Sequence, residues 1–146
     1  MSIIDATANI GVSTYYLAKV FKKVYAIELV EETFNYLNNN VKIFIKSNQI
    51  VNNIEVFHDD CIKISCKLPS NVIFIDPPWT GINYKFKDNI SLNLSDMSLD
   101  KVISLFKKKY IFIKAPYNFN VSSIYDISYK IEIFNLKKII IIKIEL

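Results

Sequence analysis

The chain has 146 residues, enough for one domain with a substantial core and too few for two domains of ordinary size. Hydrophobic residues make up 51% and charged residues 22%, which excludes a disordered chain, and no apolar run reaches the roughly 20 residues of a membrane span. The net charge is +4 and all 18 basic residues are lysine, so contacts with nucleic acid must use point charges and aromatic faces. We expect a single domain over residues 1–146 that does not enter a membrane.

Short apolar runs alternate with amphipathic stretches along the chain, a pattern typical of α/β proteins with a parallel sheet. The sequence predicts strands at 2–5, 24–29, 54–60, 71–76 and 110–116. It predicts helices at 12–23, 30–48 and 98–109. The runs at 129–136 and 137–146 leave no room for a crossover helix, so they should pair antiparallel. A parallel sheet that closes in an antiparallel hairpin is therefore expected.

The predicted helices are amphipathic. The apolar face of the first consists of Tyr16, Leu17, Val20 and Phe21. The apolar face of the second consists of Phe34, Leu37, Val41 and Phe44. Glu31 and Glu32 lie in the first turn of the second helix, where negative charge is favourable. For the third helix, Ser98 is the expected N-cap and Asp100 lies in the first turn.

Polar side chains follow the first three strands, at the edge where open parallel sheets bind ligands. Asp5 opens the segment "DATANIG", in which Gly11 gives a tight turn. Glu28 ends the second strand, where an acidic residue in nucleotide-binding sheets accepts the ribose hydroxyls, and Asp60 can accept a hydrogen bond from an exocyclic amine. Each could instead be a turn former or a solvated strand end. Their joint spacing favours a nucleotide-like cofactor, and the missing glycine fingerprint disfavours NAD or FAD.

The segment "NVIFIDPPWTGINY" concentrates rare residues after the fourth strand. It holds two of the four prolines, the only tryptophan and one of the two glycines. At this point the chain resembles class I S-adenosylmethionine-dependent methyltransferases that carry [DNS]-P-P-[YFW] there and methylate exocyclic amino groups of bases. It is most similar to the RNA cap guanine-N2 methyltransferases, the trimethylguanosine synthase family. The segments "IIDATANIGVSTYYLA", "VYAIEL", "IEVFHDDC" and "VIFIDPPWTGINY" follow that family's order and spacing.

The resemblance implies a Rossmann-like sheet of seven strands with helices on both faces, S-adenosyl-L-methionine as cofactor and a capped RNA as substrate. The implied catalytic residues are Asp76, Pro77 and Trp79. The implied cofactor contacts are Asp5, Ala6, Thr7, Asn9, Gly11, Thr14, Glu28, Leu29, Asp60, Cys61 and Asp76. The implied substrate contacts are Trp79, Gly81, Tyr84, Lys85, Tyr117 and Asn118.

The chemistry of base methylation explains the motif. An exocyclic amine delocalises its lone pair into the ring, so acceptors on its N–H groups, such as the Asp76 carboxylate and the Pro77 carbonyl, favour attack on a methyl group. Prolines remove N–H donors and stiffen the loop. Trp79 offers a face on which a cationic 7-methylguanine gains about 0.5–2 kcal/mol. The alternative is that the prolines only end a strand and Trp79 fills the core, with residues 84–87 as a solvated loop.

Three features depart from the cap enzymes, and one of them is Asn9 at the second glycine position of the first loop, which is tolerable because asparagine visits the left-handed region more readily than most residues. The cap enzymes commonly have Ser before the two prolines, whereas Asp76 is typical of ribosomal or transfer RNA guanine-N2 enzymes and of adenine-N6 enzymes. In addition, the family has a helical segment before the first strand, while the first strand here is expected at residue 2. An open site that a partner protein or a second copy covers is therefore expected, and a catalytically silent binding subunit is the alternative to an enzyme.

The cysteines and the amino terminus carry less information. Cys61 and Cys66 lack the CxxC spacing of zinc or redox sites and His58 is the only histidine, so we expect buried free thiols and no metal. His58 and Lys114 are expected to be structural. The chain opens "MSIIDATAN" without a basic segment, which predicts a cytoplasmic or nuclear protein.

Overall fold

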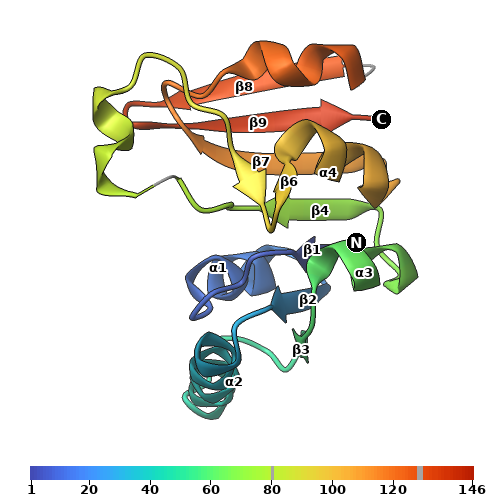
Figure 1. Cartoon of the computed structure of the whole chain (residues 1–146). Helices are drawn as coiled ribbons and strands as arrows, with labels where there is room; N and C mark the ends of the chain where they lie inside the picture. The colour runs from blue at the N-terminus through green and yellow to red at the C-terminus, as the bar shows by residue number, and fades with distance from the viewer. Residues whose placement is uncertain (80, 128–129) are drawn as a thin grey trace. The chain divides into compact units, whose positions relative to one another are not determined.

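The computed structural model describes residues 1–79, 81–127 and 130–146. The chain divides into two compact units, residues 1–74 and residues 75–146. Seven strands, labelled in Figure 1, form a sheet in the order β3-β2-β1-β4-β7-β9-β8. The first four of these run parallel, and β9 runs antiparallel to both β7 and β8. The predicted mostly parallel sheet with an antiparallel end is confirmed.

The first unit alternates strands and helices as expected. Its strands are β1 (Ser2–Asp5), β2 (Lys23–Glu28), β3 (Ile54–His58) and the start of β4 (Val72–Ile75). Its helices are α1 (Val12–Val20), α2 (Glu31–Lys46) and α3 (Cys61–Ile64), the last followed by the 3₁₀ turn η1 (Ser65–Lys67). From β1 the chain passes through α1 to β2 and through α2 to β3, and each new strand lies on the same side of the one before it. Because such crossovers between parallel strands are right-handed, α1 and α2 cover the same face of the sheet. The rings of Tyr15 and Phe44 meet there with centroids 4.9 Å apart.

The apolar face predicted for α2 is confirmed. Leu37 and Val41 are buried, while Phe34 and Phe44 are half-buried. The two acidic residues predicted for the first turn are also there.

The apolar face predicted for α1 is wrong. The buried residues of this helix are Thr14 and Ala18, and Tyr16 and Val20 are exposed. Small side chains face the sheet because Thr14 binds a buried carboxylate at the end of β1. The helix also ends earlier than predicted, since Phe21 is already extended.

The second unit contains the end of the sheet. Its strands are β5 (Asn93–Leu94), β6 (Met97–Ser98), β7 (Tyr110–Pro116), β8 (Lys130–Leu136) and β9 (Ile139–Glu145). Its helical segments are α4 (Leu99–Phe106) and the 3₁₀ turns η2 (Ile82–Phe86) and η3 (Val121–Ile127). Tyr129, the first residue of a predicted strand, lies outside the described residues. Sequence periodicity did not indicate β5, β6 or the 3₁₀ turns, because such short segments have no repeat to detect.

Ser98 occupies the predicted N-cap position of α4, but its hydroxyl does not bond a backbone N–H. A hydrogen bond from this hydroxyl to the Asp100 carboxylate lowers the pKa of Asp100 instead. The helix ends at Phe106 because Lys107 adopts a left-handed conformation with φ of 46°.

Strand β8 is the last strand of the sheet and is poorly covered. Phe134 and Leu136 are 50% and 52% exposed, whereas Ile140, Ile142 and Ile144 of the neighbouring β9 are buried. Within the described ranges, no helix combines the length and apolar character needed to cross a membrane.

Asn53 joins the end of α1 to the start of β3, which generates a stability prediction. It is 8% exposed, and its Nδ2 donates to the carbonyl oxygens of Ala18 and Phe21, each at 2.8 Å. Asn53→Ala leaves both carbonyls without this donor, so it should lower the free energy of unfolding by about 1–3 kcal/mol in urea denaturation. The exposed neighbour provides the control, since Asn52→Ala should stay within about 0.5 kcal/mol of wild type. Equal stability of the two variants would contradict this role.

Candidate active site

The turn between β1 and α1 is held by backbone hydrogen bonds. The N–H groups of Ala6, Ala8 and Gly11 each donate to a backbone carbonyl oxygen at 2.9 Å. The acceptors are Phe74, Ile27 and Ala8, respectively. Asn9 has a φ of 49°, in the left-handed region that asparagine adopts more readily than most residues. The turn therefore has one well-defined conformation.

Asp5, at the end of β1, is completely buried. Its Oδ2 accepts hydrogen bonds from the hydroxyls of Ser13 at 2.8 Å and Thr14 at 2.7 Å. Both donors belong to the first turn of α1, where the helix dipole also favours a negative charge. Asp5 therefore anchors the helix to the strand, and a cofactor contact of Asp5 stays a prediction.

Gly11 is favoured by its backbone conformation and by the neighbouring helix. It has a φ of 99°, and a Cβ at this position would lie 3.0 Å from the Leu37 Cδ1 atom of α2. Asn40 of the same helix donates from Nδ2 to the Ile10 carbonyl at 2.8 Å. Helix α2 thus lies directly against the turn, and no larger side chain than glycine fits without displacement.

Glu28 ends β2 with its carboxylate fixed by two backbone groups. Oε2 accepts from the Asn9 N–H and Oε1 from the Val30 N–H, both at 2.9 Å. Each carboxylate oxygen has a second lone pair, so the half-buried group can also accept a pair of hydroxyl groups. Leu29 follows Glu28 in the chain, and Ile10 follows Asn9. They are 55% and 44% exposed and offer apolar surface.

Asp60 caps the short helix α3. Its Oδ1 accepts from the Ile62 N–H at 2.9 Å, and its Oδ2 lies 3.8 Å from the Lys63 ammonium. Burial, together with the negative charges of Asp60 and Glu28, raises the pKa of the adjacent Cys61 thiol to about 12. Because both carboxylates act on one thiol, the ends of β2 and β3 contribute to the same electronegative region.

The prediction of two buried thiols is half wrong. Cys61 is buried, but Cys66 is exposed. Cys66 lies in the η1 turn, where Ser65 takes the buried position.

In the second unit, Asp76 follows β4 and forms an ion pair that sequence reasoning missed. Its Oδ2 lies 2.6 Å from Nζ of Lys114, which is on β7, and the two side chains are 28% and 34% exposed. The sequence does indicate that Lys114 has a partner, because it is the only charged residue in the otherwise apolar run "YIFIKAP".

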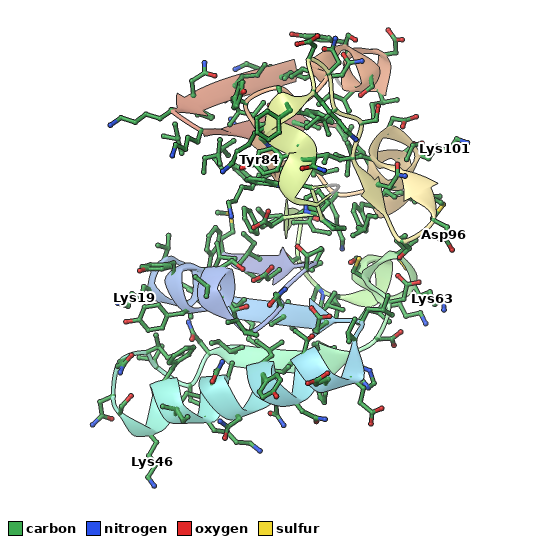
Figure 2. All side chains as sticks on the ribbon, turned by 60° about the vertical axis from the view of Figure 1, so that its left-hand side comes forward. Lys19, Lys46, Lys63, Tyr84, Asp96 and Lys101 are labelled. Atoms are coloured by element: carbon green, nitrogen blue, oxygen red, sulfur yellow. The ribbon has the colours of Figure 1, made fainter. Side chains whose placement is uncertain are left out.

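Trp79 lies in a cluster beside this ion pair. The Tyr84 ring (Figure 2) stands edge-on to the Trp79 ring with centroids 5.4 Å apart and planes at 78°. The Lys114 ammonium lies 5.5 Å from the Trp79 ring centroid. Trp79 is half-buried, and its Nε1 has no hydrogen-bond partner among the described residues. The tryptophan therefore contacts a cation already and keeps part of its surface exposed.

Asn118 stabilises the loop that carries Tyr84. Its Nδ2 donates to the carbonyl oxygens of Tyr84 at 2.8 Å and Lys87 at 2.6 Å. This amide nitrogen is thus used to shape the loop, and a substrate contact of Asn118 stays a prediction. Lys85 is exposed, with its ammonium 5.8 Å from the Tyr84 ring centroid.

The other predicted site residues vary in burial. Ala6 and Pro77 are buried, Thr7 is half-buried, and Gly81 and Tyr117 are exposed. No cluster of three or more His, Cys, Asp or Glu residues that could hold a metal ion occurs in the part of the chain that the structure describes.

The sequence matches the model of a family described as RNA cap guanine-N2 methyltransferase over residues 1–145. It is also 31% identical over 152 residues to an uncharacterized protein of Acanthamoeba polyphaga mimivirus. That match covers 98% of this chain and 57% of the viral protein, so the chain spans little more than half the length of this relative.

Solved structures share the fold at low sequence identity. A proposed rRNA methylase from Clostridium thermocellum matches with a TM-score of 0.65 and 9% identity, covering 99% of this chain and 87% of that one. A proposed methyltransferase from Streptococcus mutans, in complex with SAH, matches with a TM-score of 0.63 and 13% identity, covering 99% and 88%. Precorrin-6y C5,15-methyltransferase from Geobacter metallireducens matches with a TM-score of 0.68 and 14% identity, covering 100% and 80%. These similarities establish a Rossmann-like methyltransferase fold.

The buried Cys61 thiol predicts a loss of stability at alkaline pH. An unfolded thiol ionises near its ordinary pKa of 9.0, while the folded protein keeps the proton up to a pKa of about 12. The unfolded state therefore releases a proton first, and between these values the free energy of unfolding should fall by about 1.4 kcal/mol per pH unit. Urea denaturation at several pH values should show this slope in wild type and in Cys66→Ala, but a smaller slope in Cys61→Ala. Identical slopes in all three proteins would rule out the effect.

Proposed function

Because the chain belongs to the RNA cap guanine-N2 methyltransferase family, whose methyl donor is S-adenosylmethionine, we propose that it methylates the exocyclic N2 amino group of guanine in RNA. The observation that carries the proposal is the partly exposed Asp76 carboxylate beside the half-buried Trp79. An acceptor next to an aromatic face suits a flat base that bears an amino group. We further propose that residues 1–146 act as a single domain.

The side chains of the first unit fit S-adenosylmethionine, which supplies an electrophilic methyl group when bound. Glu28 has two backbone-oriented oxygens that suit the two ribose hydroxyls. Leu29 offers exposed apolar surface for the adenine ring, and Asp60 offers an acceptor for the adenine amine. These contacts would hold the cofactor through its nucleoside.

Asp76 is the proposed acceptor for the substrate amine. A hydrogen bond from the amine to this carboxylate localises the nitrogen lone pair, and it strengthens as the nitrogen becomes positive, so it favours the transition state over the ground state. When the nitrogen gains the methyl group it must lose a proton, and Asp76 is the candidate group to receive it. Pro77 and Pro78 lack N–H donors that would compete for the carboxylate.

We propose the 7-methylguanosine cap as the RNA target. The family description and the partly exposed Trp79 ring support it, since an aromatic face can bind the positive charge of 7-methylguanine. A capped RNA implies action in the cytoplasm or nucleus, and a partner protein or a second copy is the proposed cover of the site. The second candidate is an uncharged guanine or an adenine N6 in RNA, which Asp76 in place of serine favours.

Removal of the Glu28 carboxylate should weaken cofactor binding. A charge-assisted hydrogen bond contributes about 1.5–3 kcal/mol, so Glu28→Ala should raise the Kd of S-adenosylhomocysteine by about tenfold or more in calorimetry. Glu31→Ala removes an equal charge from the exposed first turn of α2 and should leave the Kd unchanged. An unaltered Kd in a folded Glu28→Ala protein would remove Glu28 from the cofactor site.

Trp79→Ala should separate substrate stacking from core packing. Loss of a stacking platform should raise the KM for capped RNA by about fivefold to a hundredfold while the affinity for S-adenosylhomocysteine stays unchanged. Phe86→Ala, in the same loop and 86% exposed, is the matched control and should keep the wild-type KM. A core residue would instead cost about 3–5 kcal/mol of stability on truncation.

The products decide between the candidate functions. Methyl transfer from labelled cofactor to m7G-capped, uncapped and adenine-only RNA should give N2-methylated 7-methylguanosine from the capped RNA alone. N6-methyladenosine would move the assignment to an adenine enzyme. Cofactor binding without any methylated product would indicate a catalytically silent binding subunit.

A further inference from the structure

Lys114 contacts both parts of the proposed acceptor site. Its Nζ lies 2.6 Å from Oδ2 of Asp76 and 5.5 Å from the centroid of the Trp79 ring. The two contacted residues are separated by Pro77 and Pro78, so the chain between them is stiff and a single ammonium group links its two ends.

The backbone that carries Lys114 is rigid. Strand β7 pairs with β9 along its whole length, and Lys114 lies opposite Ile141. Its neighbours Ile113 and Ala115 are fully buried. Lys114 thus belongs to a paired strand, whereas Asp76 and Trp79 lie in the loop after the end of β4.

We propose that Lys114 is a positioning residue for methyl transfer, which holds the Asp76 carboxylate and the Trp79 ring in the orientations that the substrate amine requires. This inference rests on the proposed function. An acceptor that is misplaced by about 1 Å can cost a hundredfold in rate, so the ion pair affects turnover although Lys114 itself need not touch the substrate.

Two lysines provide a matched comparison. Lys143 on β9 forms an ion pair with Glu132 at 2.7 Å, is 27% exposed, and lies 5.8 Å from the Tyr110 ring centroid. It therefore has the same kinds of contact as Lys114, at residues with no proposed role in the reaction. Methionine retains most of the lysine stem without the charge, so Lys114→Met and Lys143→Met test the same chemical change at two places.

Steady-state kinetics should distinguish the two lysines. We expect Lys114→Met to lower kcat by about tenfold to a hundredfold and to raise the KM less than Trp79→Ala does, with the Kd of S-adenosylhomocysteine unchanged. Lys143→Met should keep the wild-type kcat, and Lys114→Arg, which retains the charge, should recover part of the lost activity. A wild-type kcat in folded Lys114→Met would overturn the proposal.

A double-mutant cycle tests whether Lys114 acts through Asp76. If it does, Lys114→Met combined with Asp76→Asn should lose little more activity than Asp76→Asn alone. Independent, multiplicative losses would show that Lys114 acts elsewhere and would overturn the proposed positioning role.

Fluorescence provides a readout that needs no activity, because Trp79 is the only tryptophan. Lys114→Met should increase acrylamide quenching of this residue and shift its emission, and Lys143→Met should do neither. If wild type fails to methylate any RNA, the proposed function fails, while the fluorescence still tests the contact between Lys114 and Trp79. Unchanged quenching in Lys114→Met would show that Lys114 does not hold the ring.

Discussion

The first unit depends on one buried carboxylate. Removing the charge of Asp5 from water is unfavourable unless hydrogen-bond donors compensate it, and the donors are the hydroxyls of Ser13 and Thr14. This requirement fixes the start of α1 against the end of β1. The turn between them then has little freedom, so Asn9 can present its N–H to Glu28 and Gly11 can lie against α2. The position of the Glu28 carboxylate at the end of β2 therefore depends on the hydrogen bonds that Asp5 accepts at the end of β1.

The acidic residues after the strands share a property that bears on binding. Glu28 accepts two backbone N–H groups, Asp60 caps α3 and Asp76 pairs with Lys114. Each side chain is thus fixed before any ligand arrives, which lowers the entropy lost on binding. Each of these carboxylates thus has a structural contact as well as a proposed ligand. A sequence pattern that places an acidic residue after a strand is compatible with both roles.

The sequence predicted the elements with strong periodicity and missed features set by tertiary contacts. The strands and the apolar face of α2 were predictable because apolar residues repeat at the spacing of each structure. The face of α1 was not, because Thr14 turns inward to reach Asp5 and leaves Tyr16 exposed. The strand-end carboxylates were found from topology, since parallel strands end at one edge. Lys114 was missed, because its partner lies 38 positions away in the chain.

The exposed edge strand β8 affects how the protein behaves at high concentration. Among the described strands none pairs with its outer edge, and Phe134 and Leu136 add exposed apolar surface. Such an edge can pair with the same edge of another molecule and start aggregation. Lys137 and Lys138 are exposed just after it, so approaching edges repel each other there. Because salt screens this repulsion over about 8–10 Å at ordinary ionic strength, the protein should remain dispersed better in dilute buffer than in concentrated salt.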